Sequence, residues 1–532
     1  MTDTISAILE HAHENFAVLT AVKWKKGKNI FEKTYEDLWN DSRNIAGFLR
    51  DKGFVRSRVV IIGEASYGWI TTYLALTCGG HLAIPLDIAL PEGELTELIN
   101  RSDAEAVFLA PAMEGLSDSI RKNCPKVRSV FTLGREETTP SLISEISANT
   151  GNDNATGASV VPATENLSRN GSLNDVTEFP VHDCSDEVCT MIFTSGTTGI
   201  SKGVMLTHRN LAENVASLPV SFEPGIVLLS VLPIHHAYCL TSDWLTGFYY
   251  GSCICINDSL MHMVRNMGIF QPDYMLMVPL MLETIAQKLS AFSDEVPKAV
   301  IRENVFGKNL KCIFSGGAHL DPYYVDFFRN YGILISEGYG MSECSPVITM
   351  NGITEEGNRP GTVGRPIRNA QLKIVDGEIW VKSTSIMKGY YQMPEETSQT
   401  ITEDGWLRTG DLGAIDEDGY LTITGRVKNL IISSNGENIS PEEIENQFAL
   451  EPMISEIVIT GEKNGLAAHI YPNEETAQKE DLLPEQVRES LQKLLDLYNQ
   501  GQPSYRMITK LILRDQPFIK SSTKKIKRNL VG

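Results

Sequence analysis

The chain has 532 residues, enough for about three structural units with substantial cores. Hydrophobic residues make up 42% and charged residues 21%, as in ordinary globular proteins, which excludes a mostly disordered or fibrous chain. With 47 Lys and Arg against 67 Asp and Glu the net charge is −20, and such a field repels phosphate backbones, which argues against a general nucleic-acid binder.

Cysteine usage and hydropathy indicate the compartment. Nine cysteines are scattered without a paired CxxC pattern, and several lie in apolar runs, so we expect reduced, mostly buried thiols and a cytoplasmic protein. Residues 1–10 show no basic region followed by an apolar one, so no signal peptide is expected. Long uninterrupted apolar stretches are absent from the sequence, which predicts a soluble protein with at most peripheral membrane contact.

The first quarter of the chain alternates short apolar runs with amphipathic stretches. Arg58–Ile62, Leu82–Pro85 and Ala106–Leu109 have the composition of buried strands. A helical pattern runs through Trp69–Cys78, and a Glu-rich helix is expected from Pro91. This alternation predicts βαβ units and a mostly parallel sheet.

From about Thr138 to Thr177 the chain becomes polar, with no helical or strand period, which predicts a surface insertion. A strand is expected again at Glu187–Phe193, and βα alternation then continues to about Pro366.

Short strands with turn signals follow. Leu372–Val375, Glu378–Val381 and Tyr420–Thr424 predict a small β-barrel or distorted sheet. From Asn429 onward the charged, helix-rich sequence predicts a small α+β domain, with one helix beginning at Pro441. The expected fold class is therefore α/β, with a large N-terminal domain of two βαβ subdomains plus a small β-barrel, and a small α+β C-terminal domain.

The densest cluster of glycines and hydroxyls, residues 194–203 (TSGTTGISKG), follows the Glu187–Phe193 strand and precedes a helical pattern that opens near Thr207. Glycines permit close backbone approach, and hydroxyls and amides donate to phosphate oxygens, so the cluster predicts a polyphosphate cradle; a flexible loop is the alternative. Gly203 rather than Ser or Thr follows Lys202, which excludes a Walker A loop.

In this context the string resembles the signature of the adenylate-forming superfamily, which includes acyl-CoA synthetases, luciferases and peptide-synthetase adenylation domains. The resemblance spans nearly the whole chain and implies an adenylation domain, residues 1–427, and a mobile C-terminal domain, residues 428–532. The residues of the string that it implies to bind ATP or AMP are Thr194, Ser195, Gly196, Thr197, Thr198, Gly199 and Lys202.

Two further segments resemble motifs of this family. Residues 315–318 (SGGA) resemble its adenine-contacting turn, and residues 336–343 (SEGYGMSE) resemble the motif that follows. The resemblance implies that Tyr339 stacks on adenine, Ser342 touches the α-phosphate and Glu343 helps to hold Mg²⁺, an ion that prefers carboxylate and phosphate oxygens. Most members have Thr where Ser342 stands, and the hydroxyl is retained. The other nucleotide-binding residues implied here are Gly316, Gly317, Ala318, Glu337 and Gly338.

Residues 406–411 (WLRTGD) and 425–428 (GRVK) resemble the ribose-binding motif and the interdomain hinge. The resemblance implies that Asp411 and Arg426 bind the ribose hydroxyls and that Lys428 is the pivot about which the small domain rotates. It also implies that Gly436 approaches the pantetheine tunnel after rotation.

On its residues alone, the segment from Phe518 to Arg528 is a solvated basic tail. Aligned on the Thr-x-x-Gly-Lys-Ile-x-Arg pattern of the family, Lys525 takes the place of the catalytic lysine, because Ile526 and Arg528 keep the register. Lys524 replaces the usual glycine and is the alternative.

The acyl side is less specific. Residues 232–236 (LPIHH) are similar to the apolar-Pro-x-x-His segment of the family, which implies that His236 lies near the acyl pocket; a core histidine is the alternative. The apolar segments 238–240, 244–250 and 275–282 are expected to wall this pocket and favour fatty substrates, although ordinary core packing explains any single residue equally well.

The chain looks most like bacterial medium- or long-chain fatty acyl-CoA synthetases. This resemblance implies ATP, Mg²⁺ and coenzyme A as cofactors, a carboxylic acid activated to acyl-AMP, and transfer of the acyl group to a thiol. Its catalytic residues would be Lys525, Glu343 and Ser342. Two alternatives stay open: a ligase that loads an acyl carrier protein, and a catalytically silent acyl or nucleotide binder.

Overall fold

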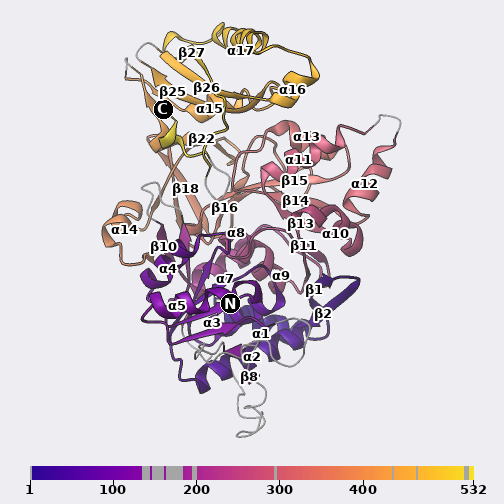
Figure 1. Ribbon diagram of the computed structural model, residues 1–532, viewed down its shortest axis with the longest axis vertical. Helices are drawn as coiled ribbons and strands as arrows, with labels where there is room; N and C mark the ends of the chain where they lie inside the picture. Colours follow the sequence, from indigo (N-terminus) through magenta and orange to yellow (C-terminus); the bar gives the residue numbers. More distant parts are fainter. Residues whose placement is uncertain are drawn as a thin grey trace, which may run out of the picture. The chain divides into compact units, whose positions relative to one another are not determined.

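A computed structural model of the chain is shown in Figure 1. It forms two compact units: the first comprises Met1–Leu372 and Val381–Leu407, and the second comprises Lys373–Trp380 and Arg408–Gly532. The predicted domain boundary between residues 427 and 428 stays a prediction. The residues that the structure describes are 3–134, 144–145, 161–162, 184–194, 201–292, 296–433, 436–462, 465–520 and 526–531.

A nine-stranded sheet of the first unit has the order β17-β16-β15-β14-β13-β11-β12-β1-β2. The strands from β15 to β1 in this order pair in parallel, and antiparallel strands lie at both ends. The predicted βα alternation is thus confirmed. The strands are β1 Thr20–Lys26, β2 Asn29–Thr34, β11 Val227–Ser230, β12 Cys253–Ile256, β13 Tyr274–Met277, β14 Cys312–Ser315, β15 Leu334–Gly340, β16 Val347–Met350 and β17 Arg365–Pro366.

A second nine-stranded sheet has the order β20-β10-β9-β4-β3-β5-β6-β7-β8. Its parallel strands β4, β3 and β5 coincide with three sequence-predicted strands to within one residue. Strands β7 and β8 lie within the predicted insertion 138–177, most of which falls outside the described residues. The strands are β3 Arg58–Ile62, β4 Leu82–Leu86, β5 Ala106–Leu109, β6 Ser129–Thr132, β7 Ser144–Glu145, β8 Val161–Pro162, β9 Val188–Thr194, β10 Lys202–Thr207 and β20 Gly389–Tyr390.

Helices flank both sheets (Figure 1). α3 is buried along its whole length, which its sequence explains, because a helix that is apolar on all sides needs cover on all sides. Trp69 and Leu74 of α3 share one hydrophobic core with Val22 of the first sheet and Ile61 of the second. The helices of the first unit are α1 Ile5–Phe16, α2 Tyr35–Asp51, α3 Tyr67–Cys78, α4 Glu92–Arg101, α5 Ser117–Asn123, α7 His208–Ser217, α8 Ala237–Cys239, α9 Thr246–Tyr249, α10 Met263–Phe270, α11 Pro279–Leu289, α12 Lys298–Phe306, α13 Pro322–Arg329 and α14 Pro394–Thr400.

The glycine-rich string lies between β9 and β10, and β10 leads into α7. β9 and β10 pair antiparallel, with Thr194 opposite Lys202. α7 begins one residue after Thr207, whose Oγ1 accepts a hydrogen bond from the Asn210 amide at 3.1 Å, while Asn210 Oδ1 accepts from the Thr207 amide at 2.9 Å. The predicted strand before the string and the predicted helix start near Thr207 are both confirmed, and β10 between them is an element that the sequence analysis did not predict. Residues 202–207 are too few for their apolar pattern to distinguish a strand from the start of a helix.

The short strands predicted between residues 372 and 424 form a four-stranded sheet of order β18-β19-β21-β22. Its first hairpin turns at Asp376 and Gly377, whose φ angles of 51° and 81° are those that a tight two-residue hairpin requires. The strands are β18 Ala370–Val375, β19 Glu378–Ser383, β21 Leu407–Ile415 and β22 Leu421–Arg426.

The C-terminal part of the second unit is an α+β structure, as predicted. A sheet of order β25-β26-β27 shares a hydrophobic core with α15 and α17. Ser440 stands at the N-cap position of α15, but its Oγ donates to the Thr424 carbonyl at 2.6 Å and does not cap the helix. The elements are β23 Ile431–Ile432, β24 Asn438–Ile439, α15 Pro441–Asn446, β25 Ile454–Glu462, β26 Gly465–Pro472, α16 Glu474–Lys479, α17 Pro484–Asn499 and β27 Ile508–Leu513.

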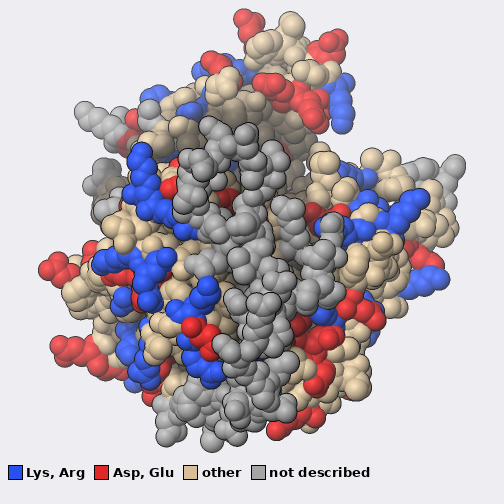
Figure 2. Space-filling view, turned by 60° about the horizontal axis from the view of Figure 1, so that its bottom comes forward, with Lys and Arg blue, Asp and Glu red and all other residues tan. Residues whose placement is uncertain are grey.

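Surface and thiol properties agree with the composition. All nine cysteines are unpaired; eight are buried, and Cys184 is half-buried. Basic and acidic side chains are interspersed over the face shown in Figure 2. In the part of the chain that the structure describes, every helix is too short or too polar to cross a lipid bilayer.

Candidate active site

Glu343 lies in a buried turn directly after β15. It belongs to the short 3-10 helix Ser342–Cys344 and is only 9% exposed. The hydroxyl of Tyr390 donates a hydrogen bond to Glu343 Oε1 at 2.8 Å, and the Met387 amide donates to the Glu343 carbonyl at 2.8 Å. Both the side chain and the main chain of Glu343 are therefore held by the segment that contains β20.

Helix α7 holds the same turn through a buried amide. Asn214 is fully buried, and its Nδ2 donates to the carbonyl oxygens of Cys344 at 3.1 Å and Val347 at 2.9 Å. Its Oδ1 accepts from the Val347 amide at 3.3 Å. Because an unpaired buried amide costs free energy, these bonds hold the turn that carries Glu343 against α7.

Lys202 and Glu343 both contact Tyr390. The Lys202 ammonium is 4.6 Å from the centroid of the Tyr390 ring, a distance at which a cation is attracted to the ring face. β10 and β20 pair antiparallel, with Val204 opposite Tyr390. The predicted residues Ser195, Gly196, Thr197, Thr198 and Gly199 lie outside the described residues.

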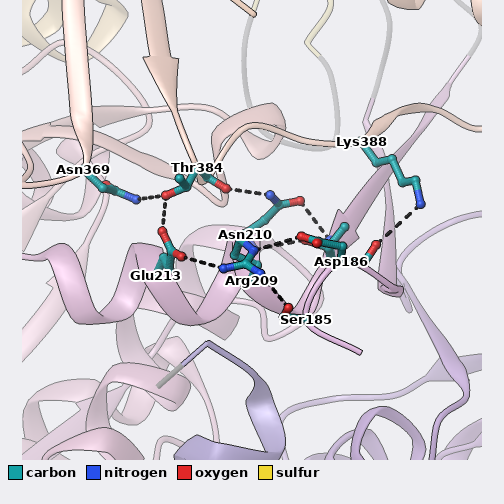
Figure 3. A network of polar contacts seen from close by, with 9 residues as sticks. Ser185, Asp186, Arg209, Asn210, Glu213, Asn369, Thr384 and Lys388 are labelled. Atoms are coloured by element: carbon teal, nitrogen blue, oxygen red, sulfur yellow. Dashed lines mark hydrogen bonds and ion pairs between the residues drawn. The ribbon is translucent and has the colours of Figure 1, made fainter. Parts of the chain in front are cut away.

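A polar network attaches the segment around Tyr390 to α7 (Figure 3). Asn210 Nδ2 donates to the Thr384 carbonyl at 2.7 Å, and Lys388 Nζ donates to the Asp186 carbonyl at 3.5 Å. The Asp186 carboxylate in turn binds Arg209 Nε at 2.9 Å. This network thus connects β20, α7 and the residues that precede β9.

The predicted adenine turn follows β14 at the carboxyl edge of the parallel strands, where ligands of open α/β sheets bind. A Cβ atom on Gly316 would lie 3.3 Å from the ring of Tyr238, and one on Gly317, whose φ is +87°, would lie 3.9 Å from Val278. Ala318 is exposed. Two half-buried apolar side chains, Tyr238 and Val278, therefore border this turn.

β15 changes partners within the second nucleotide motif. It pairs in parallel with β14 up to Glu337, and then antiparallel with β16 at Gly338 and Tyr339. A Cβ atom on Gly340 would lie 2.0 Å from the Pro346 carbonyl oxygen, so only glycine fits there. Tyr339 is half-buried.

Glu337, in the second nucleotide motif, is a buried carboxyl group. It is 7% exposed, and its Oε1 has no hydrogen-bond partner among the described residues. Burial raises the pKa of Glu337 to about 8, and the charge of Asp321 contributes in the same direction, while the Gly361 amide acts against it. The carboxyl is therefore mostly protonated at neutral pH.

His236 stands at the N-cap position of α8, beside a second histidine. The rings of His235 and His236 are 4.3 Å apart, and His235 Nε2 lies 3.7 Å from Asp87 Oδ2. Burial, with a smaller contribution from His236, lowers the pKa of His235 to about 4, so His235 is neutral at pH 7. His236 is half-buried.

A buried carboxyl group lies between two of the segments expected to wall the acyl pocket. Residues Leu240–Leu245 form a π-helical turn, a feature often found at functional sites. Asp243 is fully buried, burial raises its pKa to about 6, and its Oδ1 has no hydrogen-bond partner among the described residues. Trp244 and Phe248 are fully buried core residues. The two predicted apolar segments thus flank a buried carboxyl group.

In the second unit, the predicted ribose and hinge residues lie together. Asp411 and Arg426 are opposite each other on β21 and β22, and Arg426 Nε is 2.8 Å from Asp411 Oδ1. Burial, then the charge of Arg426, lowers the pKa of Lys428, while Asp411 and Glu442 act against this shift. Gly436 has a φ of +81°, in the left-handed region that favours glycine.

Ion pairs anchor the C-terminal tail to α15. Arg528 Nη2 binds Glu445 Oε2, and Arg528 Nε lies 3.7 Å from Glu442 Oε1. Glu445 also accepts from the Ile459 amide at 2.6 Å. Lys524 and Lys525 themselves lie outside the described residues.

In the first unit, the residue at one position, Glu343, suits the predicted Mg²⁺ ion. Mg²⁺ is usually bound by one or two carboxylates together with substrate phosphates. Glu343 provides one buried carboxylate that a hydroxyl donor orients, which suits an ion that arrives with the nucleotide. In the described residues there is no group of three or more His, Cys, Asp or Glu that could hold a metal ion.

The profile of the AMP-binding enzyme family matches residues 9–391, and that of the AMP-binding enzyme C-terminal domain matches residues 428–531. The chain therefore belongs to this family of adenylate-forming enzymes, as its motifs predicted.

Among curated relatives, the long-chain-fatty-acid–CoA ligase FadD15 of Mycobacterium bovis is 28% identical over 453 residues, which cover 76% of this chain and 71% of that protein. A chloroplastic long-chain-fatty-acid–[acyl-carrier-protein] ligase of Arabidopsis thaliana is 30% identical over 65% of this chain and 60% of that protein. The 4-coumarate–CoA ligase 3 of Oryza sativa is 33% identical over 54% of each chain. These relatives support an adenylate-forming acyl-CoA ligase activity.

Solved structures show the same fold. ATP-bound MatB from Rhodopseudomonas palustris superposes with a TM-score of 0.79 at 24% identity, covering 100% of this chain and 98% of that one. The predicted fold class is thus confirmed.

Three site features escaped the sequence analysis: Tyr390, Asn214 and the strand β10. Tyr390 follows a glycine in a turn-rich region, and Asn214 is one of several polar residues on an amphipathic helix. Neither has a sequence signal of its own, because the contacts of both residues arise only when distant segments pack together.

Replacement of Glu337 by Gln should reduce the pH dependence of stability. Because burial raises the folded-state pKa of Glu337 to about 8 from the ordinary 4.5, the folded protein keeps a proton that the unfolded chain releases. Stability therefore falls as pH rises from about 5 to about 8. Calorimetry should show a smaller fall in unfolding temperature over this range for Glu337→Gln, whereas the exposed Glu94→Gln should behave as the unaltered protein. An identical pH slope for Glu337→Gln would contradict this assignment.

Replacement of Arg528 by Met should destabilise the second unit, because it leaves the largely buried Glu445 without its charged partner. We expect a loss of about 2 to 3 kcal/mol in urea unfolding followed by hydrogen exchange of α15. Arg506→Met is the matched control, since its partner Glu443 is 40% exposed, and it should cost less than about 1 kcal/mol. Equal losses for both variants would show that burial of the Arg528 pair has no special effect.

Proposed function

We propose that the chain activates a medium- or long-chain fatty acid with ATP and transfers the acyl group to coenzyme A. The observation that carries the choice of substrate is the apolar border of the Gly316-Gly317 turn, where Tyr238 and Val278 lie beside the predicted nucleotide site. The similarity to FadD15 over 76% of the chain supports the same choice.

In the first half-reaction, a carboxylate oxygen of the fatty acid attacks the α-phosphorus of ATP. A new P–O bond forms, the bond from the α-phosphorus to the bridging oxygen breaks, and pyrophosphate leaves with that electron pair. Both reactants are anionic, so positioning and charge neutralisation provide most of the rate enhancement. We assign the role of the neutralising cation to the Lys525 ammonium. The hydroxyl of Ser342 would donate a hydrogen bond to the α-phosphate. Glu343 would hold Mg²⁺, which would neutralise charge on the phosphates.

The other predicted residues complete the nucleotide site in this proposal. Asp411 and Arg426, which pair with each other here, would bind the ribose hydroxyls. Tyr339 would stack on adenine, and the Gly316–Ala318 turn would contact the edge of the base. Thr194 and Lys202 stand at the two ends of the glycine-rich loop, on paired positions of β9 and β10, and would contact the phosphates.

In the second half-reaction, the CoA thiol gives its proton to water, and the thiolate attacks the acyl carbonyl carbon of acyl-AMP. A C–S bond forms, the C–O bond to phosphate breaks, and AMP leaves. We assign the conformational step between the half-reactions to rotation of residues 428–532 about Lys428, with Gly436 then near the pantetheine and His236 near the acyl group.

A second candidate acceptor is an acyl carrier protein, because the carrier-protein ligase of Arabidopsis thaliana is 30% identical over 65% of this chain. Both acceptors present a phosphopantetheine thiol, so the chemistry of the second half-reaction is the same.

The proposal is tested by measuring pyrophosphate release with ATP and Mg²⁺ across saturated fatty acids, aryl acids and amino acids. Each acid is assayed with CoA, with holo acyl carrier protein and with neither. Turnover of fatty acids that accelerates with CoA supports the proposal, and acceleration with carrier protein alone supports the second candidate. Turnover of aryl acids in preference to fatty acids, or no turnover with any acid, would refute the fatty-acid assignment.

Replacement of Lys525 by Ala should lower the rate of acyl-AMP formation by at least about a hundredfold, because the charge that neutralises the reacting oxyanions is lost. Thioester formation from pre-made acyl-AMP and CoA should stay within about threefold of the unaltered rate, because Lys525 acts only in the first half-reaction. Single-turnover kinetics measure the two steps separately. Lys524→Ala is the matched control, and a larger loss of adenylation in this variant would transfer the catalytic role to Lys524.

A further inference from the structure

Tyr390 is a buried tyrosine to which the proposed mechanism gives no part. It is 6% exposed, and its hydroxyl donates to Glu343 Oε1 at 2.8 Å. The hydroxyl of a tyrosine carries one proton to donate, and here that proton is directed at the Glu343 carboxylate.

The backbone around Tyr390 fixes the direction of this hydroxyl. The Tyr390 amide donates to Thr397 Oγ1 at 2.9 Å, which connects it to α14. The Tyr391 amide donates to the Gly203 carbonyl at 2.8 Å, and the Lys388 amide donates to the Met205 carbonyl at 2.9 Å. Tyr390 is thus anchored on both sides by β10, the strand that begins at Lys202.

The chemistry of a phenol suits the orientation of a metal-binding carboxylate. A neutral O–H fixes one carboxylate oxygen without cancelling its negative charge, whereas an ammonium in the same place would compete with a cation. Partners of this kind fix the geometry of metal ligands, and their loss commonly lowers metal affinity tenfold or more. On the other side of the interaction, the Lys202 ammonium contacts the face of the Tyr390 ring, which ties the phenol to the start of β10.

We propose that Tyr390 is a positioning residue, which orients the Glu343 carboxylate for the Mg²⁺ ion of bound Mg·ATP. This inference rests on the proposed function, because it takes Glu343 as the carboxylate that meets the metal–nucleotide complex.

The test compares ATP binding by Tyr390→Phe and by the unaltered full-length protein, measured by isothermal titration calorimetry with no acyl substrate present. The titration is done once with excess Mg²⁺ and once with EDTA. We expect Tyr390→Phe to weaken ATP binding about tenfold with Mg²⁺ and less than about twofold with EDTA. In the presence of ATP, binding of Mn²⁺ followed by electron paramagnetic resonance should weaken by the same factor.

Two variants separate the hydroxyl from the rest of the side chain. Tyr391→Phe is the matched control, because this neighbouring hydroxyl donates to Asp103 Oδ2 at 2.6 Å and not to Glu343; it should bind Mg·ATP as the unaltered protein does. Tyr390→Leu also removes the ring beneath Lys202, so it should weaken binding both with Mg²⁺ and with EDTA.

The outcomes distinguish this inference from the proposed function. Failure of the unaltered protein to bind ATP in either buffer would refute the proposed function itself. Normal ATP binding by the unaltered protein, with equal losses for Tyr390→Phe in Mg²⁺ and EDTA or with no loss at all, would overturn the positioning role alone. A loss confined to the Mg²⁺ titration and to Mn²⁺ binding supports it.

Discussion

The hydrogen bond from the Tyr390 hydroxyl to Glu343 is the contact at which three separate parts of the first unit meet. Tyr390 comes from β20, Glu343 from the turn after β15, and β10 pairs with β20 beside them. Hydrogen bonds from Asn214 on α7 hold the turn that carries Glu343. Since both partners are buried, the bond forms only when all of these elements pack correctly, so the geometry of the predicted metal–phosphate site depends on the fold of the whole unit.

The fold was largely predictable from the sequence, because its strands are short and almost wholly apolar. Arg58–Ile62 and Ala106–Leu109 appear in the structure with the predicted bounds, since buried parallel strands have no polar face that obscures their ends. The strand Lys202–Thr207 was missed because it is antiparallel, short and directly followed by a helix cap. Sequence periodicity separates strands from helices poorly over so few residues.

The candidate site was predictable only where a motif is continuous in the chain. Asp411 and Arg426 were assigned to one function from two motifs, and the pairing of β21 with β22 places them in contact. Tyr390 and Glu343 are 47 residues apart in the sequence, and no local sequence pattern predicts a contact between them. The protonation of Glu337 was equally hidden, because it depends on burial and on Asp321 and Gly361, which are distant in the sequence.

The burial of the thiols has a practical consequence for observing conformational change. Eight of the nine cysteines are enclosed by the core, and only Cys184 is half-buried, so water-soluble maleimides should reach few native sulfur atoms in the folded protein. With Cys184 replaced by Ser, one cysteine introduced on the surface of each unit would provide a pair of fluorophore attachment sites on an otherwise native background. Energy transfer between the two dyes would then show whether the two units move relative to each other during single turnovers, without the removal of the buried cysteines that pack the core.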